Sequence, residues 1–190
     1  MPLKVNKTLT IQKDVSRETE KVFLEYYKIL KQWNESVSLM KTGNWEDFFH
    51  RHVMDGLYLN ECIASEKEIT DIGSGAGVPG IILSILGHKV TMVESCRKKC
   101  IFLNFTARAL SLDCTIQQER IEKMEVRDER IITARALTSL TNLLQYLENL
   151  NGGITGLFLK GEKLEEEITE AENLFDFSYD IYSKNMESGY

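Results

Sequence analysis

The sequence predicts a doubly wound α/β fold, in which a mainly parallel sheet carries helices on both faces. Short apolar runs typical of buried strands alternate along the chain with longer segments of helical period. Four glycines follow the first of these strands within residues 73–80, and an apolar helix is predicted directly after them at 81–86. An acid, Glu94, ends the next predicted strand. Strand, glycine-rich turn, helix and acid in this order are typical of the ligand crevice of such sheets.

The N-terminal part of the chain is predicted to form two helices ahead of the sheet. Residues 1–15 are polar, and we expect them to be loosely held. Ser16 is a suitable N-cap for a helix whose apolar residues recur at helical spacing. Asn44 is a suitable N-cap for the second helix. In that helix Arg51 and Asp55 are four residues apart, which predicts a surface ion pair, with a phosphate or cofactor contact as the alternative.

The remaining elements follow in regular alternation. The predicted strands are 69–72, 89–94, 114–118, 130–134 and 154–159, and the helices between them lie at 81–86, after Arg97, and at 140–150. An acidic amphipathic helix begins at Leu164, and the alternation from Phe175 to Ile181 predicts a half-buried strand. Because the carboxyl ends of parallel strands face one crevice, four polar residues should converge there: Asp71, Glu94, Arg135 and Lys160.

The glycine turn favours one ligand over two others. A phosphate-binding Walker loop needs Lys followed by Ser or Thr where this chain has Ile81 and Ile82, so that function is excluded. The glycines also fit a dinucleotide fingerprint, but the carboxylate of Asp71 would repel a pyrophosphate. The same carboxylate would attract a sulfonium and an amino group, which favours S-adenosylmethionine (SAM). Glu94 lies 21 residues after Gly73, where an acid accepts hydrogen bonds from ribose hydroxyls.

Composition limits the classes of protein. A chain of 190 residues with 43% hydrophobic and 27% charged residues suits a single globular domain, and we divide it at 1–66, 67–183 and 184–190. These segments are a helical extension, the SAM-binding core and a tail. Apolar runs are too short for a membrane helix, and His and Cys spacing fits no zinc site, so we expect a cytoplasmic protein without membrane or metal.

Charge is distributed unevenly along the chain. Residues 162–190 carry nine acids and two lysines, a net −7, so residues 1–161 carry +1 of the total of −6. A near-neutral body gives no general basic surface, and any RNA contact must come from local clusters. Arg97-Lys98-Lys99 is such a cluster, because three cations in the first turn of a helix oppose its dipole. A merely solvated face is the alternative.

Several motifs together resemble one family, the RsmG (GidB) methyltransferases, which use SAM to methylate N7 of a guanosine in bacterial small-subunit (16S) rRNA. The resemblance covers residues 24–172. It rests on Leu30-Lys-Gln-Trp-Asn34, Arg51-His-Val-Met-Asp55, Asp71-Ile-Gly-Ser-Gly-Ala-Gly-Val-Pro-Gly80, Val93-Glu-Ser95 with Lys98-Lys99 and Phe102-Leu103, Arg120-Ile-Glu122, Arg135-Ala-Leu137 and Lys160-Gly161. It implies a class I SAM-dependent methyltransferase, a Rossmann-like sheet flanked by helices, with an N-terminal helical extension.

The resemblance also implies which residues bind SAM. In this family SAM is contacted by the first glycine of the turn, the residue before its proline, the pair after the third strand and the arginine after the fourth strand. In this chain these positions are Gly73, Val78, Ile121 with Glu122, and Arg135. Together with the reasoning above, the predicted cofactor site consists of Asp71, Gly73, Gly75, Val78, Glu94, Ile121, Glu122 and Arg135.

The chain departs from the family pattern in two places. Val37-Ser-Leu-Met40 replaces the more usual Asn-Leu-Thr ending of the first helix. The family's sheet has the strand order 3-2-1-4-5-7-6, but only nine residues follow Ile181, so the last strand is expected to be missing. Residues 175–183 would then lack their usual neighbour, unless this tail finds another partner.

The implied reaction is direct methyl transfer from SAM to guanine N7. N7 already presents a lone pair, so no general base is expected and we assign no catalytic residue. Arg135 and Lys160 are candidates to orient guanine O6 or a flanking phosphate. The expected partner is 16S rRNA or the small ribosomal subunit, and we expect a monomer. The alternatives are a SAM methyltransferase of a small molecule or protein, a nicotinamide-dependent oxidoreductase, and a non-catalytic RNA-binding or ribosome-assembly factor with a SAM pocket.

Overall fold

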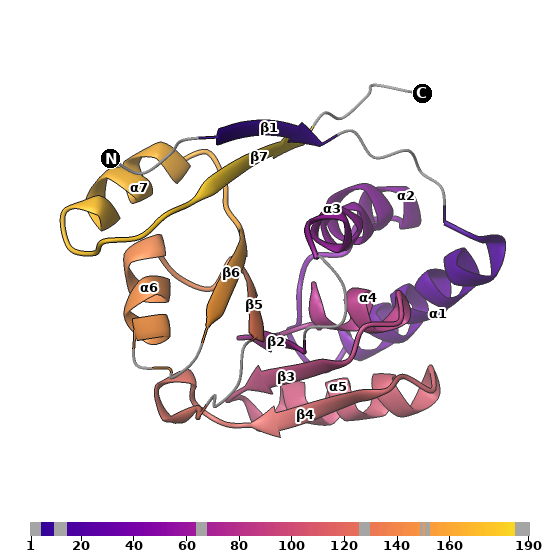
Figure 1. The fold of residues 1–190 in the computed structure, drawn as a ribbon. Coiled ribbons are helices and arrows are strands. Elements are labelled where there is room, and N and C mark those ends of the chain that lie inside the picture. The colour runs from indigo at the N-terminus through magenta and orange to yellow at the C-terminus, as the bar shows by residue number, and fades with distance from the viewer. Residues whose placement is uncertain are drawn as a thin grey trace.

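A parallel five-stranded sheet forms the centre of the fold (Figure 1). The structure is a computed structural model that describes residues 5–9, 15–63, 68–125, 130–148, 150 and 153–184. The sheet has the order β4-β3-β2-β5-β6, and its strands are β2 (Ile69–Ile72), β3 (Val90–Glu94), β4 (Cys114–Gln118), β5 (Arg130–Arg135) and β6 (Ile154–Leu159). The predicted doubly wound sheet is thus confirmed, and its five strands match the five predicted between residues 69 and 159 to within one residue.

The middle strand, β2, is short and buried along its whole length. Ile69 lies opposite Val90 of β3 on one side and Ile131 of β5 on the other. A strand with neighbours on both sides and helices on both faces has no solvated face, which is why its residues are not alternately polar. The carboxyl end of β2 therefore opens in the middle of one edge of the sheet, where the glycine turn begins.

Two hydrophobic clusters lie on opposite faces of the sheet. Met92 and Ile131 belong to the larger cluster, which also contains the apolar side chains of the N-terminal helices. Their chain neighbours Val93 and Ile132 belong to the second cluster, together with Leu143. Because side chains alternate across a strand, adjacent apolar residues of one strand can each serve one face. The sheet is therefore covered on both faces, as predicted.

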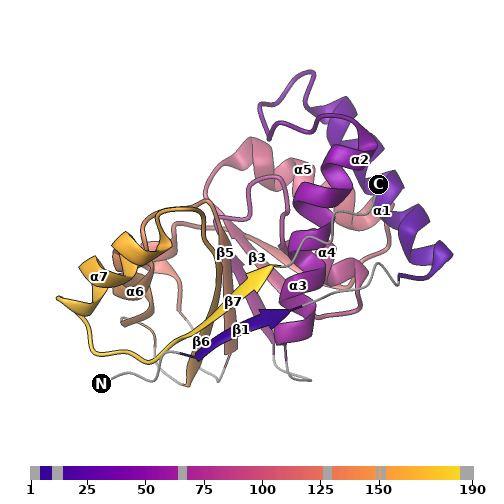
Figure 2. The same ribbon diagram turned by 90° about the horizontal axis from the view of Figure 1, so that it is seen from above.

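The helices are distributed over these two faces (Figures 1 and 2). In Figure 1, α6 and α7 lie to the left of the sheet, and α1, α3 and α4 lie to its right. Their bounds are α1 (Arg17–Trp33), α2 (Trp45–Phe48), α3 (Met54–Cys62), α4 (Gly80–Ile85), α5 (Arg97–Ala109), α6 (Leu140–Glu148) and α7 (Leu164–Glu172). Among the described residues, none of these helices is both long and apolar enough to cross a bilayer.

Both predicted N-caps of the N-terminal helices are confirmed. Ser16 Oγ accepts a hydrogen bond from Thr19 N at 3.1 Å, and Asn44 Oδ1 accepts one from Asp47 N at 2.8 Å. The second helix is not continuous, because a π-helical turn, η1 (Phe49–Val53), separates α2 from α3. Such turns hold one residue more than an α-helical turn and are frequent at functional sites. The periodicity of the sequence predicts the helix but not this turn.

The two ends of the described chain meet in a second, two-stranded parallel sheet. β1 (Val5–Leu9) pairs with β7 (Asp180–Lys184), and Val5 lies opposite Asp180. The two strands run side by side at the top of Figure 1, apart from the central sheet. The expectation that residues 1–15 are loosely held is therefore wrong for 5–9, because the C-terminal strand finds its partner there. The strand predicted from Phe175 is also shorter than expected, since it begins only at Asp180.

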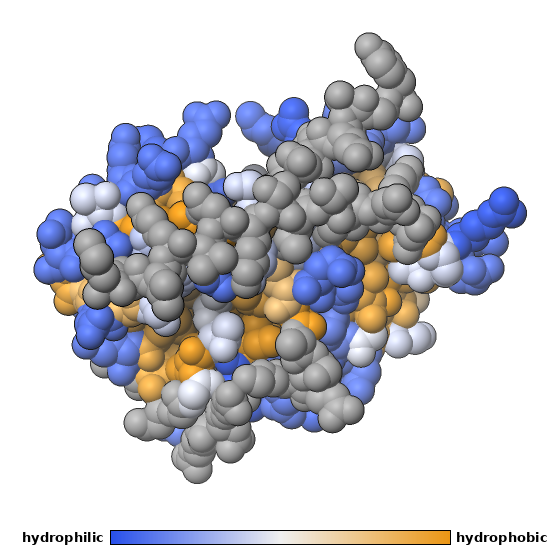
Figure 3. Space-filling view, turned by 45° about the horizontal axis from the view of Figure 1, so that its top comes forward, coloured by the Kyte–Doolittle hydropathy of each residue, from blue (hydrophilic) through white to orange (hydrophobic). Residues whose placement is uncertain are grey.

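The face shown in Figure 3 mixes both kinds of surface. Hydrophobic side chains gather near the middle of this view, and hydrophilic side chains lie around them. Four large hydrophobic residues are exposed in the described part of the chain: Ile101, Phe105, Leu174 and Tyr182. Single exposed apolar residues are common in soluble proteins. Ile101 and Phe105, however, lie four residues apart on α5 and so on the same face of that helix, which needs an explanation.

Candidate cofactor and acceptor site

The glycine turn lies at the carboxyl end of β2 and presents bare backbone. The amides of Gly73 and Ser74 both donate to the Val93 carbonyl, at 2.8 and 3.2 Å, which fixes the turn to β3. Gly75 has a φ of +56°, in the left-handed region. A Cβ added at Gly75 would meet only the Gly73 carbonyl oxygen, at 3.7 Å. The space above Gly75 is therefore open, as a ligand that approaches the backbone requires.

Asp71 lies beneath the turn. Its side chain is buried, with the residue 1% exposed. One carboxylate oxygen accepts a hydrogen bond from Thr133 Oγ1 at 2.9 Å, and the other accepts one from Gly80 N at 3.2 Å. Burial raises the pKa of this carboxyl to about 6. Asp71 thus joins β5 to the start of α4 and supports the turn from inside, whereas the sequence predicts that its carboxylate faces the ligand.

Glu94 lies at the side of the turn and joins it to α5. Its Oε2 accepts a hydrogen bond from Gly75 N at 2.9 Å, and its Oε1 accepts one from Cys96 N at 2.7 Å. Only 7% of the residue is exposed. The carboxylate is therefore held beside the open backbone of Gly75, which is where the sequence predicts a ribose.

A tyrosine of the N-terminal extension holds the turn from a third side. The hydroxyl of Tyr26, a fully buried residue of α1, donates to the Ala76 carbonyl at 2.5 Å. Burial raises the pKa of Tyr26, with the charge of Asp71 adding to it, so the hydroxyl stays a neutral donor. The sequence assigns the aromatic residues of this helix to the core. No local signal separates Tyr26 from Phe23, which is also fully buried.

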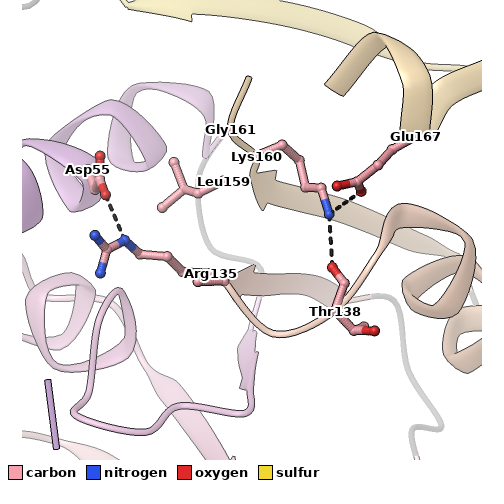
Figure 4. A pocket seen from close by; sticks show the side chains of 8 residues that line it. Asp55, Arg135, Thr138, Leu159, Lys160, Gly161 and Glu167 are labelled. Carbon is pink, nitrogen blue, oxygen red and sulfur yellow. Dashed lines mark hydrogen bonds and ion pairs between the residues drawn. The ribbon is translucent and has the colours of Figure 1, made fainter. Parts of the chain in front are cut away.

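Arg135, at the end of β5, joins the sheet to the π-helical segment (Figure 4). Its Nε donates to Asp55 Oδ2 at 2.8 Å, and its Nη2 lies 2.8 Å from His52 Nδ1. Arginine has only donors, so His52 Nδ1 accepts and the ring is neutral. Burial, with the positive charge of Arg135, lowers the pKa of His52 to about 4. The predicted surface position of Asp55 is wrong, because Asp55 is 7% exposed and binds a residue 80 positions away.

Lys160, at the end of β6, is held by two oxygen acceptors. Its Nζ lies 2.5 Å from Glu167 Oε2 and donates to the Thr138 carbonyl at 2.9 Å. The same Glu167 oxygen accepts a hydrogen bond from Leu140 N at 2.7 Å. Lys160 and Glu167 thereby fix the loop after β5 to α7. An ammonium has three donors, and acceptors within the described part of the chain account for two of them, which leaves one for a ligand.

A cavity of about 330 Å³ lies between these two groups at the carboxyl ends of β5 and β6 (Figure 4). It is lined by Asp55, Arg135, Ala136, Thr138, Leu159, Lys160, Gly161 and Glu167. In Figure 4 the Arg135–Asp55 pair lies on one side of Leu159 and the Lys160–Glu167 pair on the other. The volume is near the lower limit for small-molecule pockets. The cavity is thus large enough for one flat polar group.

The four residues expected to converge form two neighbouring groups. Arg135 and Lys160 line the cavity, whereas Asp71 and Glu94 hold the glycine turn, which is not part of the lining. The loop after β5 joins the two groups, because Leu137 packs so closely on the turn that a Cβ at Gly73 would come within 2.5 Å of it. The structure therefore offers a backbone surface for one ligand and an adjoining cavity for another.

The other predicted cofactor residues border the same edge of the sheet. Val78 is buried among apolar side chains, so its backbone is what it offers to a ligand. Ile121 and Glu122 begin the short η2 (Ile121–Lys123) after β4, with Ile121 packed on the second core cluster and Glu122 exposed. Ala136 in the cavity wall has a φ of +49°, a strained conformation for a residue with a Cβ.

Fold and site together define a class. The glycine turn after the middle strand, the acid on the neighbouring strand and the order β4-β3-β2-β5-β6 are those of a class I SAM-dependent methyltransferase. Among solved structures, the fold resembles that of a putative RNA methyltransferase, PH1948 from Pyrococcus horikoshii, with a TM-score of 0.50 at 14% identity over 82% of this chain and 80% of that one.

Sequence comparison identifies the family. The family model of rRNA small subunit methyltransferase G (GidB) matches residues 19–188. Ribosomal RNA small subunit methyltransferase G of Gluconobacter oxydans (strain 621H) is 39% identical over 178 residues, which are 92% of each chain. The protein of the same name from Rickettsia prowazekii (strain Madrid E) is 37% identical over 159 residues, 83% of each chain. The chain belongs to this family, as its motifs predicted.

Proposed function

We propose that this protein uses SAM to methylate N7 of a guanine in small-subunit (16S) rRNA. Family membership over most of the chain carries this proposal. The site supports it, because an open backbone surface at Gly75 and a held carboxylate at Glu94 adjoin a cavity with two cations. A substrate in the ribosome also favours the proposed cytoplasmic location, and we propose that the protein acts as a monomer.

The residues around the glycine turn suit SAM. The Gly75 backbone leaves room for the nucleoside, and Glu94 lies beside it with a carboxylate that can accept from ribose hydroxyls. Ile121 and Glu122 are proposed to border the adenine, and Gly73, Val78 and Arg135 the methionine part. Asp71 is proposed to act through the turn that it supports. SAM would supply an electrophilic methyl group on a sulfonium.

The cavity suits a guanine that needs orientation and no deprotonation. Guanine N7 carries a lone pair, and O6 beside it accepts hydrogen bonds in the way that arginine recognises. The Nη1 group of Arg135 has no recorded partner among the described residues, so its donors are available to O6. The remaining donor of Lys160 can bind O6 or a neighbouring phosphate. Alignment of the reactants can by itself supply about 7–11 kcal/mol.

The test is methyl transfer to small ribosomal subunits from cells that lack this protein. With labelled SAM, the wild-type protein is expected to label the rRNA, and digestion should yield N7-methylguanosine. Calorimetry measures SAM binding separately. If the label is transferred to a small molecule or a protein, the protein is a methyltransferase of another substrate. If the protein binds NAD in place of SAM, it is an oxidoreductase. If it binds RNA and forms no methylated product, it is an assembly factor. Each of these results would overturn the proposal.

A matched pair of variants tests the cofactor surface. Gly75→Ala places a methyl group in the open space above the turn, whereas Gly87→Ala adds one where nothing lies within 4 Å. Both glycines have positive φ, so both variants carry backbone strain. We expect only Gly75→Ala to lose SAM affinity. Equal affinities in the two variants would mean that SAM does not approach Gly75.

A further inference from the structure

The outer face of α5 combines two features that the SAM site does not explain. The helix contains four basic residues and no acid, in a chain whose net charge is −6. Its exposed residues Arg97, Ile101, Phe105 and Arg108 follow one another three or four positions apart, so they form one stripe about 17 Å long. Lys98 is exposed beside Arg97. We call these five residues the α5 stripe.

The cations of the α5 stripe have no acidic partner among the described residues. The structure records no ion pair for Arg97, Lys98 or Arg108, although other exposed lysines, such as Lys28 and Lys89, do form them. Two of the stripe's cations also lie in the first turn of α5, where positive charge opposes the helix dipole. The stripe therefore keeps cations at a small cost in helix stability and leaves them available to an outside anion.

The apolar residues of the α5 stripe lie between these cations. Ile101 is 50% exposed and Phe105 is 49% exposed. The Phe105 ring lies 5.4 Å from the Trp33 ring at the end of α1, and Trp33 is itself only partly buried. The two rings therefore form a supported aromatic surface. Unpaired cations with an aromatic ring between them are what single-stranded nucleic acid requires, since phosphates need charge and bases need a stacking surface.

The position of the stripe connects it with the site. The first turn of α5 directly follows Glu94, whose carboxylate accepts the hydrogen bond of Cys96 N. At the other end of the molecule α7 carries five glutamates and no base. In Figure 1 α5 and α7 lie at opposite ends of the protein. A polyanion near the site is thus attracted along α5 and repelled from α7.

We propose that the α5 stripe binds a single-stranded segment of the RNA substrate, with phosphates on Arg97, Lys98 and Arg108 and a base stacked on Phe105. The inference rests on the proposed function for the identity of the RNA. It adds the surface along which that RNA lies, outside the cavity in which the guanine reacts.

The test measures binding of a fluorescent single-stranded RNA and its salt dependence. In the triple variant Arg97→Gln/Lys98→Gln/Arg108→Gln, the slope of log K against log salt should fall by about 2, since each phosphate contact contributes roughly 0.7. Phe105→Ala should weaken binding about 5- to 150-fold and leave the slope unchanged. The controls are Lys89→Gln, which removes one exposed cation elsewhere, and Leu174→Ala, which removes an exposed apolar residue beyond α7; both should bind as wild type.

SAM binding and methylation of small subunits separate this inference from the proposed function. The stripe variants should bind SAM as wild type and methylate subunits with a raised KM. If wild type methylates rRNA and the stripe variants bind RNA and methylate equally well, the stripe has no part in RNA binding although the function stands. If the stripe variants still bind RNA but no longer bind a ribosomal protein, the α5 stripe binds a protein and the inference is wrong.

Discussion

The hydroxyl of Tyr26 offers the sharpest test of how the N-terminal extension supports the cofactor turn. Tyr26→Phe removes one oxygen atom from a fully buried ring and leaves its packing unchanged. In wild type this hydroxyl donates a hydrogen bond to the Ala76 carbonyl at 2.5 Å. In the variant that buried carbonyl loses this donor. The change acts on the backbone of the turn between Gly75 and Gly77, without altering any charge.

The expected magnitude follows from two costs. A buried carbonyl without its donor costs about 1–3 kcal/mol of unfolding free energy. For a chain of this size, each kcal/mol lowers Tm by about 2–4 °C. If one residue of the loosened turn must be ordered again when SAM binds, the affinity falls by a further 1–2 kcal/mol, or about 5- to 30-fold.

The neighbouring Tyr27 provides the matched control. Its hydroxyl donates to the Gly43 carbonyl at 3.0 Å, so Tyr27→Phe removes the same kind of hydrogen bond from the same helix. Gly43 lies in the loop before α2 and not in the cofactor turn. Thermal unfolding and SAM calorimetry on both variants separate stability from binding. Both should lose stability, and Tyr26→Phe alone should lose SAM affinity; equal affinities would refute the positioning role of Tyr26.

Three further predictions follow from the same geometry. The pKa of His52 is about 4 in the folded protein and near 6.5 when the chain is unfolded, so the contribution of His52 to the unfolding free energy is full above pH 6.5 and falls by up to about 3 kcal/mol as pH drops towards 4. Because the raised pKa of Asp71 gives a slope of opposite sign in this range, the contribution is measured as the difference between wild type and His52→Gln in urea unfolding at each pH, and a difference that does not change with pH would contradict it. Ala136 and Ser111 both have a positive φ, so Ala136→Gly and Ser111→Gly should each raise the unfolding free energy by about 1 kcal/mol. Only Ala136→Gly should slow methyl transfer, because Ala136 lines the cavity. Glu94→Gln replaces one carboxylate oxygen by an amide NH₂ group, which then faces the backbone N–H of Gly75 or of Cys96 and cannot accept its hydrogen bond. Calorimetry should therefore show a SAM affinity that is lower by about 10- to 150-fold, and an unchanged affinity would exclude Glu94 from the site.

The sequence determined the features that depend on local chemistry. The five strands of the central sheet are predicted by their buried runs, and both N-terminal caps by Ser16 and Asn44, because these signals need only residues within a few positions. The glycine turn and Glu94 were found in the same way, since a strand, a turn and a helix follow one another in the chain. The motifs also identified the family correctly.

Only the tertiary structure decided which distant groups meet. Asp55 binds Arg135 across 80 residues, and Tyr26 reaches Ala76 across 50, and neither side chain carries a sign of its partner. The same is true of β7, whose pairing with β1 depends on where the chain ends come together. Sequence periodicity reports which side of an element is buried. Which polar groups are satisfied inside depends on the packing of the elements, and that is fixed only when the whole chain has folded.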